Sequence, residues 1–167
     1  QLRQRVGMAL LSMMVVGIYG LNLNWKQFAA AAYVDVLLDN AFGNFRTLLV
    51  KITTSAAMGS YLTFLGNLKA NAATGSVPDE NYARELMQLF TIGLVELDLG
   101  GTPTLANAGA TYTYGLSDIT GLARVFTGLD FDLGGQPAAS ATPTPAFNRK
   151  PMVQVRSRHE TGPKSIP

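Results

Sequence analysis

The chain has 167 residues, of which 47% are hydrophobic and 14% are charged, so it is expected to fold around its own core, and extensive disorder is excluded. It contains no cysteine, which excludes disulfide bridges and thiolate zinc sites. The net charge of +2 arises at the end of the chain, where residues 149–167 hold five Lys or Arg and one acidic residue. No aromatic side chain lies among them, so we expect a solvated segment and no nucleic-acid binding.

Residues 6–25 contain no charged side chain, and a membrane span needs roughly 20 such residues. Arg3 and Arg5 before them also imitate the basic start of a signal peptide. Glycine, serine and asparagine interrupt the apolar run, which favours a helix buried inside the protein over a membrane segment. Because the chain opens at Gln1 without a start methionine and soon enters this apolar run, we expect an internal fragment of a longer protein.

Three helices are predicted next, over residues 25–39, 45–53 and 55–65, because apolar side chains recur in them at helical spacing. Asn24 and Asn44 precede the first two, and asparagine is a good N-cap. Each helix is expected to bury one face. The inward side chains are predicted to be Trp25, Phe28, Ala29, Ala32, Tyr33, Val36, Leu37, Leu48, Leu49, Ile52, Met58, Tyr61, Leu62 and Leu65.

The clearest helix signal runs from Pro78 to Gly93, after a loop at residues 66–77. Proline suits the first turn of a helix, and glycine suits a left-handed end. At 100° per residue the stretch has two faces. One face is apolar (Tyr82, Ala83, Leu86, Met87, Leu89, Phe90), and the other is polar (Glu80, Asn81, Arg84, Glu85, Gln88, Thr91). This two-sided helix is expected to organise the core.

The rest of the chain predicts one more helix, from Gly115 or Ser117 to about Thr127. Residues 94–99 and 153–156 are candidate extended segments. We therefore expect an all-α fold, an irregular bundle of about six helices with long Gly/Pro/Ala-rich loops. Its domain organisation would be a helical core at 1–132, a flexible low-complexity loop at 133–148, and a basic extended segment at 149–167 that continues into a missing C-terminal part.

Three stretches of the chain together resemble one bacterial family, domain-of-unknown-function family 1800. The central stretch, Glu80-Asn81-Tyr82-Ala83-Arg84-Glu85 continuing to Leu89-Phe90-Thr91-Ile92-Gly93, is the most specific. The order and spacing of two others support it. These are Asn44-Phe45-Arg46 with Ala57-Met58 and Tyr61-Leu62, and Asp118-Ile119 with Leu122-Ala123-Arg124 and Thr127-Gly128.

The resemblance implies largely helical bacterial proteins of several hundred residues, often exported to the periplasm or the exterior, whose genes frequently lie beside that of a sulfatase-like protein. It implies no established reaction. The family also ends in a His-acid-x-Gly-x-Lys element, matched here by His159, Glu160, Gly162 and Lys164. The family usually has Trp after its Thr-Gly pair, where this chain has Leu129, so an aromatic stacking role at that position is in doubt.

The candidate catalytic residues are Glu80, Arg84, Glu85, Arg124 and His159. If the fold brought them together at a cleft, they would form the active site of a hydrolase. Within the central helix Glu80 and Glu85 point about 140° apart, and Glu80 with Arg84 more simply predicts an i,i+4 ion pair.

Asn81, Gln88 and Asp118 are candidates for a buried polar network, and a solvated face is the equal alternative. Helical arginines, Arg46 among them, would also suit an anion site. One histidine excludes a multi-histidine metal site, and neither a metal nor a cofactor is predicted.

The leading functional hypothesis is a non-catalytic helical module of an exported bacterial protein that binds or presents a partner, which the resemblance suggests is sulfatase-like. It rests on the absence of nucleophile-elbow and phosphate-loop motifs. The alternatives are the hydrolase with the Glu/Arg/His cleft and membrane attachment through residues 6–25. Oligomeric state is left open.

Overall fold

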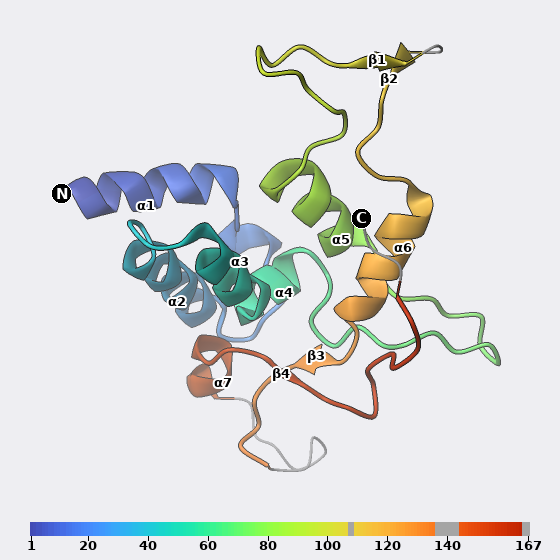
Figure 1. Ribbon diagram of the computed structural model, residues 1–167. Helices are drawn as coiled ribbons and strands as arrows, with labels where there is room; N and C mark the ends of the chain where they lie inside the picture. The colour runs from blue at the N-terminus through green and yellow to red at the C-terminus, as the bar shows by residue number, and fades with distance from the viewer. Residues whose placement is uncertain (107–108, 136–143, 165–167) are drawn as a thin grey trace.

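Helices dominate the computed structural model, which describes residues 1–106, 109–135 and 144–164 (Figure 1). Within these residues there are seven α-helices. They are α1 (Leu2–Met13), α2 (Lys26–Asp39), α3 (Phe45–Thr53), α4 (Ala56–Tyr61), α5 (Asn81–Glu85), α6 (Leu116–Val125) and α7 (Pro145–Arg149). A 3-10 turn, Ile18–Gly20, and a π-helix, η2 (Leu86–Phe90), complete the helical structure.

Helix α2 lies at the centre of the first half of the molecule, in contact with α1, α3, α4 and α7 (Figure 1). Its buried side chains, Ala29, Tyr33 and Leu37, follow the i, i+4 spacing of one helical face. The Tyr33 hydroxyl donates a 2.6 Å hydrogen bond to the carbonyl of Met14, which fixes the chain where α1 ends. The large predicted side chains Trp25 and Phe28 lie at the rim and remain partly exposed.

The first apolar run does not form one long helix, because α1 ends at Met13 and the chain then turns through Ile18–Gly20. Met14 and Leu21 are buried, while Met8 and Met13 are exposed. None of the helices in the described part of the chain has the length and apolarity to cross a membrane.

Three aromatic rings join the second half of the molecule around Tyr82. The Tyr82 ring stacks on Phe64 with centroids 4.2 Å apart and meets Phe126 edge-on at 4.8 Å, the offset and T-shaped arrangements that aromatic rings prefer. Its hydroxyl lies 2.6 Å from Thr53 Oγ1. Burial raises the pKa of Tyr82 to about 12, which keeps the phenol neutral. This cluster connects α5 with α6 and α3.

The central helix forms where it is predicted, but with a different register in its second half. Tyr82, Ala83, Met87 and Phe90 are buried as expected. Leu89, predicted to be buried, is 64% exposed. The stretch Leu86–Phe90 is a π-helix, whose wider turn changes the angle between successive side chains, so the α-helical projection fails there.

The prediction of an all-α fold is wrong, because the described residues also form two antiparallel two-stranded sheets. Strand β1 (Leu105–Ala106) pairs with β2 (Gly109–Ala110), and β3 (Leu129–Asp130) pairs with β4 (Val153–Gln154). Two-residue strands are too short to show an alternating pattern in the sequence. The partners of the second pair are also far apart along the chain, so tertiary packing brings them together.

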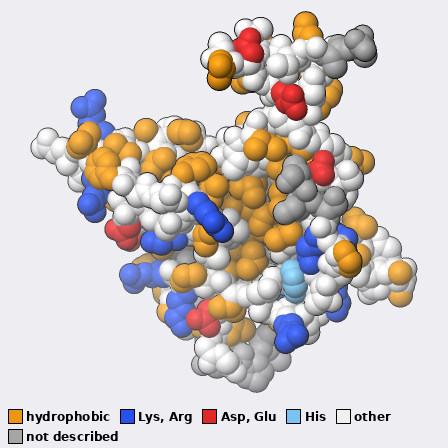
Figure 2. All heavy atoms as spheres, viewed as in Figure 1, with side chains coloured by type: hydrophobic (Ala, Val, Ile, Leu, Met, Phe, Trp, Pro, Cys, Tyr) orange, Lys and Arg blue, Asp and Glu red, His pale blue; other side chains and the backbone are white. Residues whose placement is uncertain are grey.

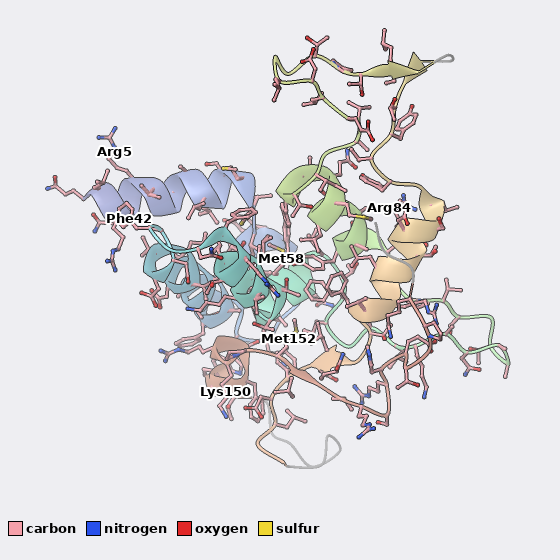
Figure 3. All side chains as sticks on the ribbon, in the orientation of Figure 1. Arg5, Phe42, Met58, Arg84, Lys150 and Met152 are labelled. Atoms are coloured by element: carbon pink, nitrogen blue, oxygen red, sulfur yellow. The ribbon has the colours of Figure 1, made fainter. Side chains whose placement is uncertain are left out.

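The end of the chain is anchored to the helical body. Pro151 bridges to Ser55, and the Met152 N–H donates a 2.6 Å bond to the carbonyl of Thr54. The Met152 side chain is buried next to α4, where a Cβ on Gly59 would come within 2.8 Å of its sulfur (Figure 3). Of the loop predicted at 133–148, residues 136–143 lie outside the described residues and Pro145 onwards belongs to α7.

Candidate functional site

The C-terminal segment docks onto the end of α6 at Thr127 and Gly128. Gly128 has a φ of +81°, and a Cβ there would lie 2.8 Å from the Val155 carbonyl and 2.9 Å from the His159 nitrogen. Only glycine adopts this positive φ without strain and has no Cβ to collide with these two atoms. The Gly128 N–H donates to the Asn67 carbonyl at 2.7 Å, and its own carbonyl accepts from Val155 at 2.7 Å. This Thr-Gly pair is therefore the point where the last segment joins the helical body.

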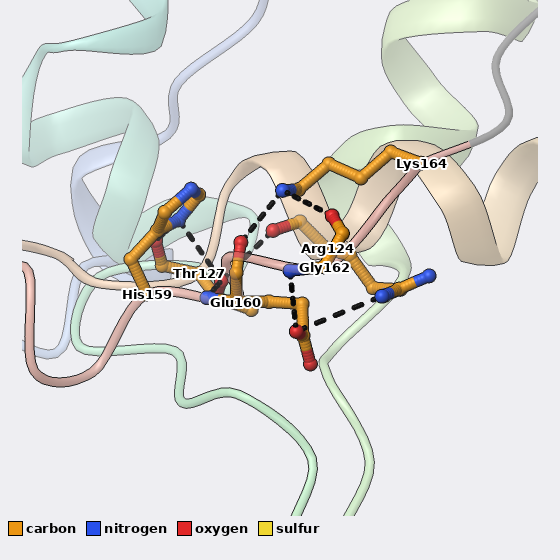
Figure 4. A network of polar contacts seen from close by, with 6 residues as sticks. All are labelled: Arg124, Thr127, His159, Glu160, Gly162 and Lys164. Atoms are coloured by element: carbon orange, nitrogen blue, oxygen red, sulfur yellow. Dashed lines mark hydrogen bonds and ion pairs between the residues drawn. The ribbon is translucent and has the colours of Figure 1, made fainter.

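We call the contact of residues 159–164 with Arg124, Thr127 and Gly128 the junction. His159 and Thr127 lie side by side in it (Figure 4). The His159 Nδ1 atom lies 2.9 Å from the Thr127 carbonyl oxygen, and the Gln154 amide nitrogen lies 3.0 Å from the same Nδ1. The Thr127 carbonyl can only accept and the Gln154 amide nitrogen can only donate, so Nδ1 hydrogen-bonds to the carbonyl when it carries the proton and to the amide when it does not. The buried Thr127 hydroxyl donates to the Arg124 carbonyl at 2.8 Å and accepts from the Glu160 N–H at 2.8 Å.

Glu160, Gly162 and Lys164 close a small loop beside them (Figure 4). The Gly162 N–H donates to Glu160 Oε1 at 3.0 Å, and Lys164 Nζ donates to the Glu160 carbonyl at 2.6 Å. Arg124 lies 3.6 Å from Glu160 Oε1. The hydrogen bond from Gly162 lowers the pKa of Glu160 below its ordinary value, and Arg124 acts in the same direction, while partial desolvation opposes both. Glu160 is thus held ionised.

The chemistry available here is limited. A carboxylate with a lowered pKa is a poor proton donor at neutral pH, so Glu160 is not suited to act as a general acid there. Within the described residues, no group of three or more His, Asp and Glu is arranged to hold a metal. The contacts of Thr127, Glu160 and Lys164 mainly fix backbone groups of the docked segment, which is a structural task.

The structure brings two of the five candidate catalytic residues together. Arg124 and His159 belong to the junction, whereas no hydrogen bond or ion pair among the described residues joins Glu80, Arg84 or Glu85 to it. The expected i,i+4 ion pair is confirmed, with Arg84 Nη2 2.6 Å from Glu80 Oε2.

The proposed network residues lie apart from one another. Asn81 and Gln88 are exposed on the central helix. Asp118 accepts from the Gly115 N–H at 2.8 Å and caps the start of α6. Asp79 caps the start of α5, where its carboxylate accepts from the Asn81 N–H at 2.8 Å. The polar face of the central helix is therefore largely solvated.

A groove of about 570 Å³ lies between α3, η2 and α6. Figure 2 shows hydrophobic side chains gathered across this face of the molecule. Most of the residues that line the groove are apolar; they are Leu49, Val50, Leu86, Met87, Ile92, Leu122 and Phe126, with Thr53, Thr54, Thr91 and Arg46.

Sequence reasoning did not find this groove, although one signal was present. Val50 and Ile92 are apolar side chains outside the predicted inward faces of their elements, and both are about half exposed here. Apolar residues on a nominally polar side are a mark of a second contact surface.

Comparison with known proteins agrees with the motifs on which the site is built. The model of the family DUF1800, described as a protein of unknown function, matches residues 1–166. No curated protein and no solved structure matches the chain. Since the match covers essentially the whole sequence, the chain belongs to the DUF1800 family.

Proposed function

We propose that this chain is a binding module that receives an apolar segment of another polypeptide in the groove between α3, η2 and α6. The observation that carries the proposal is the groove itself. Its volume of about 570 Å³ and its mostly apolar lining are those of a ligand site, and part of that lining is exposed to solvent.

Local backbone structure supports the proposal. One wall of the groove is the π-helix η2, and π-turns within helices occur frequently at functional sites. The wall includes the partly buried Leu86, while Met87 behind it belongs to the buried core. Helical proteins often bind amphipathic segments in an apolar groove between helices, and the groove between α3, η2 and α6 has this form.

Arg46 adds a charge preference. It is exposed at the groove and, in the part of the chain that the structure describes, it takes part in no side-chain hydrogen bond or ion pair. A segment with an acidic side chain beside its apolar ones would therefore bind better than a basic one.

The family resemblance adds two further proposals, an exported location and a sulfatase-like partner. The hydrolytic alternative has less support, because Glu80, Arg84 and Glu85 are not joined to the junction that holds Arg124 and His159. The groove contacts neither His159 nor Glu160, so binding does not depend on them.

The groove is tested with the fluorescent apolar probe 1,8-ANS. Val50→Glu places a charge in the groove and is expected to remove most of the ANS signal without lowering the melting temperature, since Val50 is already 58% exposed. Val77→Glu, at a 78% exposed position outside the groove, is the matched control. Equal ANS signals in both variants would contradict the proposal. Titration with the purified sulfatase-like protein then tests that partner.

A further inference from the structure

Residues 94–106 and 109–113 form an arm that stands out from the body of the protein (Figure 1). Its described segments are joined by regular hydrogen bonds, with Thr104 N–H donating to the Glu96 carbonyl at 2.9 Å and Glu96 N–H donating to the Thr111 carbonyl at 2.9 Å. At the base, the Thr113 hydroxyl bonds to the Gly93 carbonyl, and Tyr114 packs against the core. The arm is thus an ordered β-structure with a fixed base.

The large apolar side chains of the arm do not pack against the hydrophobic core. Leu97, Leu99, Leu105 and Tyr112 are each more than half exposed, and Leu99 is exposed completely. Large apolar side chains left in solvent on a projecting segment are available for contact with another molecule. Hydrogen bonding accounts for the backbone of the arm, but nothing within the described chain accounts for these side chains.

The charge of the arm is one-sided. From Gly93 to Gly115 the sequence contains Glu96 and Asp98 and no Lys or Arg. Figure 2 shows the acidic side chains at the projecting end of the molecule. The arm is therefore an apolar segment with acidic side chains, the chemistry that the groove with Arg46 at its edge would select.

We propose that the groove receives the arm of a second copy of this chain. This inference rests on the proposed function of the groove and names its occupant. The apolar side chains of the arm would cover the apolar lining, and Glu96 or Asp98 would approach Arg46. The arm begins two residues after Ile92, which lines the groove, so each arm starts at the edge of its own groove.

The base of the arm lies beside the groove, and this position suits a reciprocal exchange of arms between two copies. Two copies related by a two-fold axis would each lay an arm over the groove of the other, which gives an isologous interface and a closed dimer. The arm's own groove is not its target, because the fixed base directs the arm away from the body (Figure 1).

The absence of cysteine makes a clean crosslinking test possible. Val50→Cys in one chain and Leu99→Cys in another are mixed and treated with a bismaleimide, and the crosslinked dimer is expected in the mixture and not in either variant alone. Arg46→Glu is expected to reduce the crosslinked fraction several-fold. Glu96→Lys with Asp98→Lys is expected to restore it. Arg5→Glu, an exposed arginine on α1, is the control and should leave it unchanged (Figure 3).

Light scattering on the unmodified chain should give the mass of a dimer. Three results would overturn the inference: a monomer at all concentrations, Leu99–Leu99 crosslinks between arms, or an intramolecular crosslink in a chain carrying both cysteines. If Val50→Glu still removes the ANS signal in those cases, the groove remains a binding site with a different occupant. If the ANS signal is also unaffected, the proposed function fails with it.

Discussion

Two non-helical segments of this protein behave in opposite ways. The segment from Pro151 to Lys164 is docked on the helical body through Thr127, Gly128 and a set of backbone hydrogen bonds. The arm at 94–106 and 109–113 has regular hydrogen bonds of its own but leaves its apolar side chains in solvent. Hydrogen bonds alone do not determine whether a segment joins the body. The docked segment fits closely against the backbone at Gly128, whereas the arm leaves its apolar side chains without packing partners.

The largest expected effect is a difference in unfolding free energy between alanine variants at two glycines that have nearly the same φ. Gly128 at the junction and Gly101 in the arm have φ of +81° and +83°. Gly128→Ala adds a collision with the Val155 carbonyl to the left-handed strain and is expected to cost about 3 kcal/mol of unfolding free energy.

Gly101→Ala meets nothing within 4 Å and serves as the control, with an expected cost of about 1 kcal/mol. Urea denaturation of both variants gives the comparison. Equal losses would mean that close fit at Gly128 is not what holds the junction.

The next test compares two threonine hydroxyls. Thr127→Val keeps the side-chain shape but leaves the Glu160 N–H without its acceptor, and we expect a loss of about 2 kcal/mol. Thr104→Val removes an exposed hydroxyl in the arm that donates to the Glu96 carbonyl, with an expected change within about 0.5 kcal/mol. Chemical denaturation measures both, and a loss at Thr104 as large as that at Thr127 would contradict the contrast.

The junction should also respond to acid. The folded-state pKa of Glu160 lies below its ordinary value, so ionised Glu160 contributes stability above its unfolded-state pKa. That contribution is lost as the pH falls from the ordinary carboxyl range through the lowered folded-state value. Glu160→Gln is expected to flatten the pH dependence of the melting temperature in that acid range and to leave the slope near pH 7 unchanged. An unaltered acid slope would argue against the contacts with Gly162 and Arg124.

The smallest expected change is at the arm. Leu99 is fully exposed, so Leu99→Ser should alter the melting temperature of dilute protein by an amount equivalent to less than about 0.5 kcal/mol. Its effect should instead appear in self-association, measured by light scattering at high concentration. A large loss of stability in the dilute protein would show that the arm packs against its own body.

The family and the helices α2, α3 and α6 could be predicted from the sequence because their signals are local. Asn44 caps α3 and accepts from the Thr47 N–H at 3.3 Å, as its position before an apolar stripe indicates. Gly115 likewise is the N-cap residue of α6, and Val153 begins a short strand. These features depend on neighbours within one or two turns.

The sheets and the site required the tertiary structure. The pairing of β3 with β4 depends on segments far apart in the chain, and so does the placement of Arg124 and His159 in one network through Thr127 and Glu160. The solvent exposure of Leu89 depends on a change of helical register. The groove arises only when α3, η2 and α6 pack together. The sequence by itself determined where α2, α3 and α6 start and which family motifs are present, since capping and periodicity act over a few residues. Only the packed structure decided which faces meet, because long-range contacts follow from how the segments fill space together.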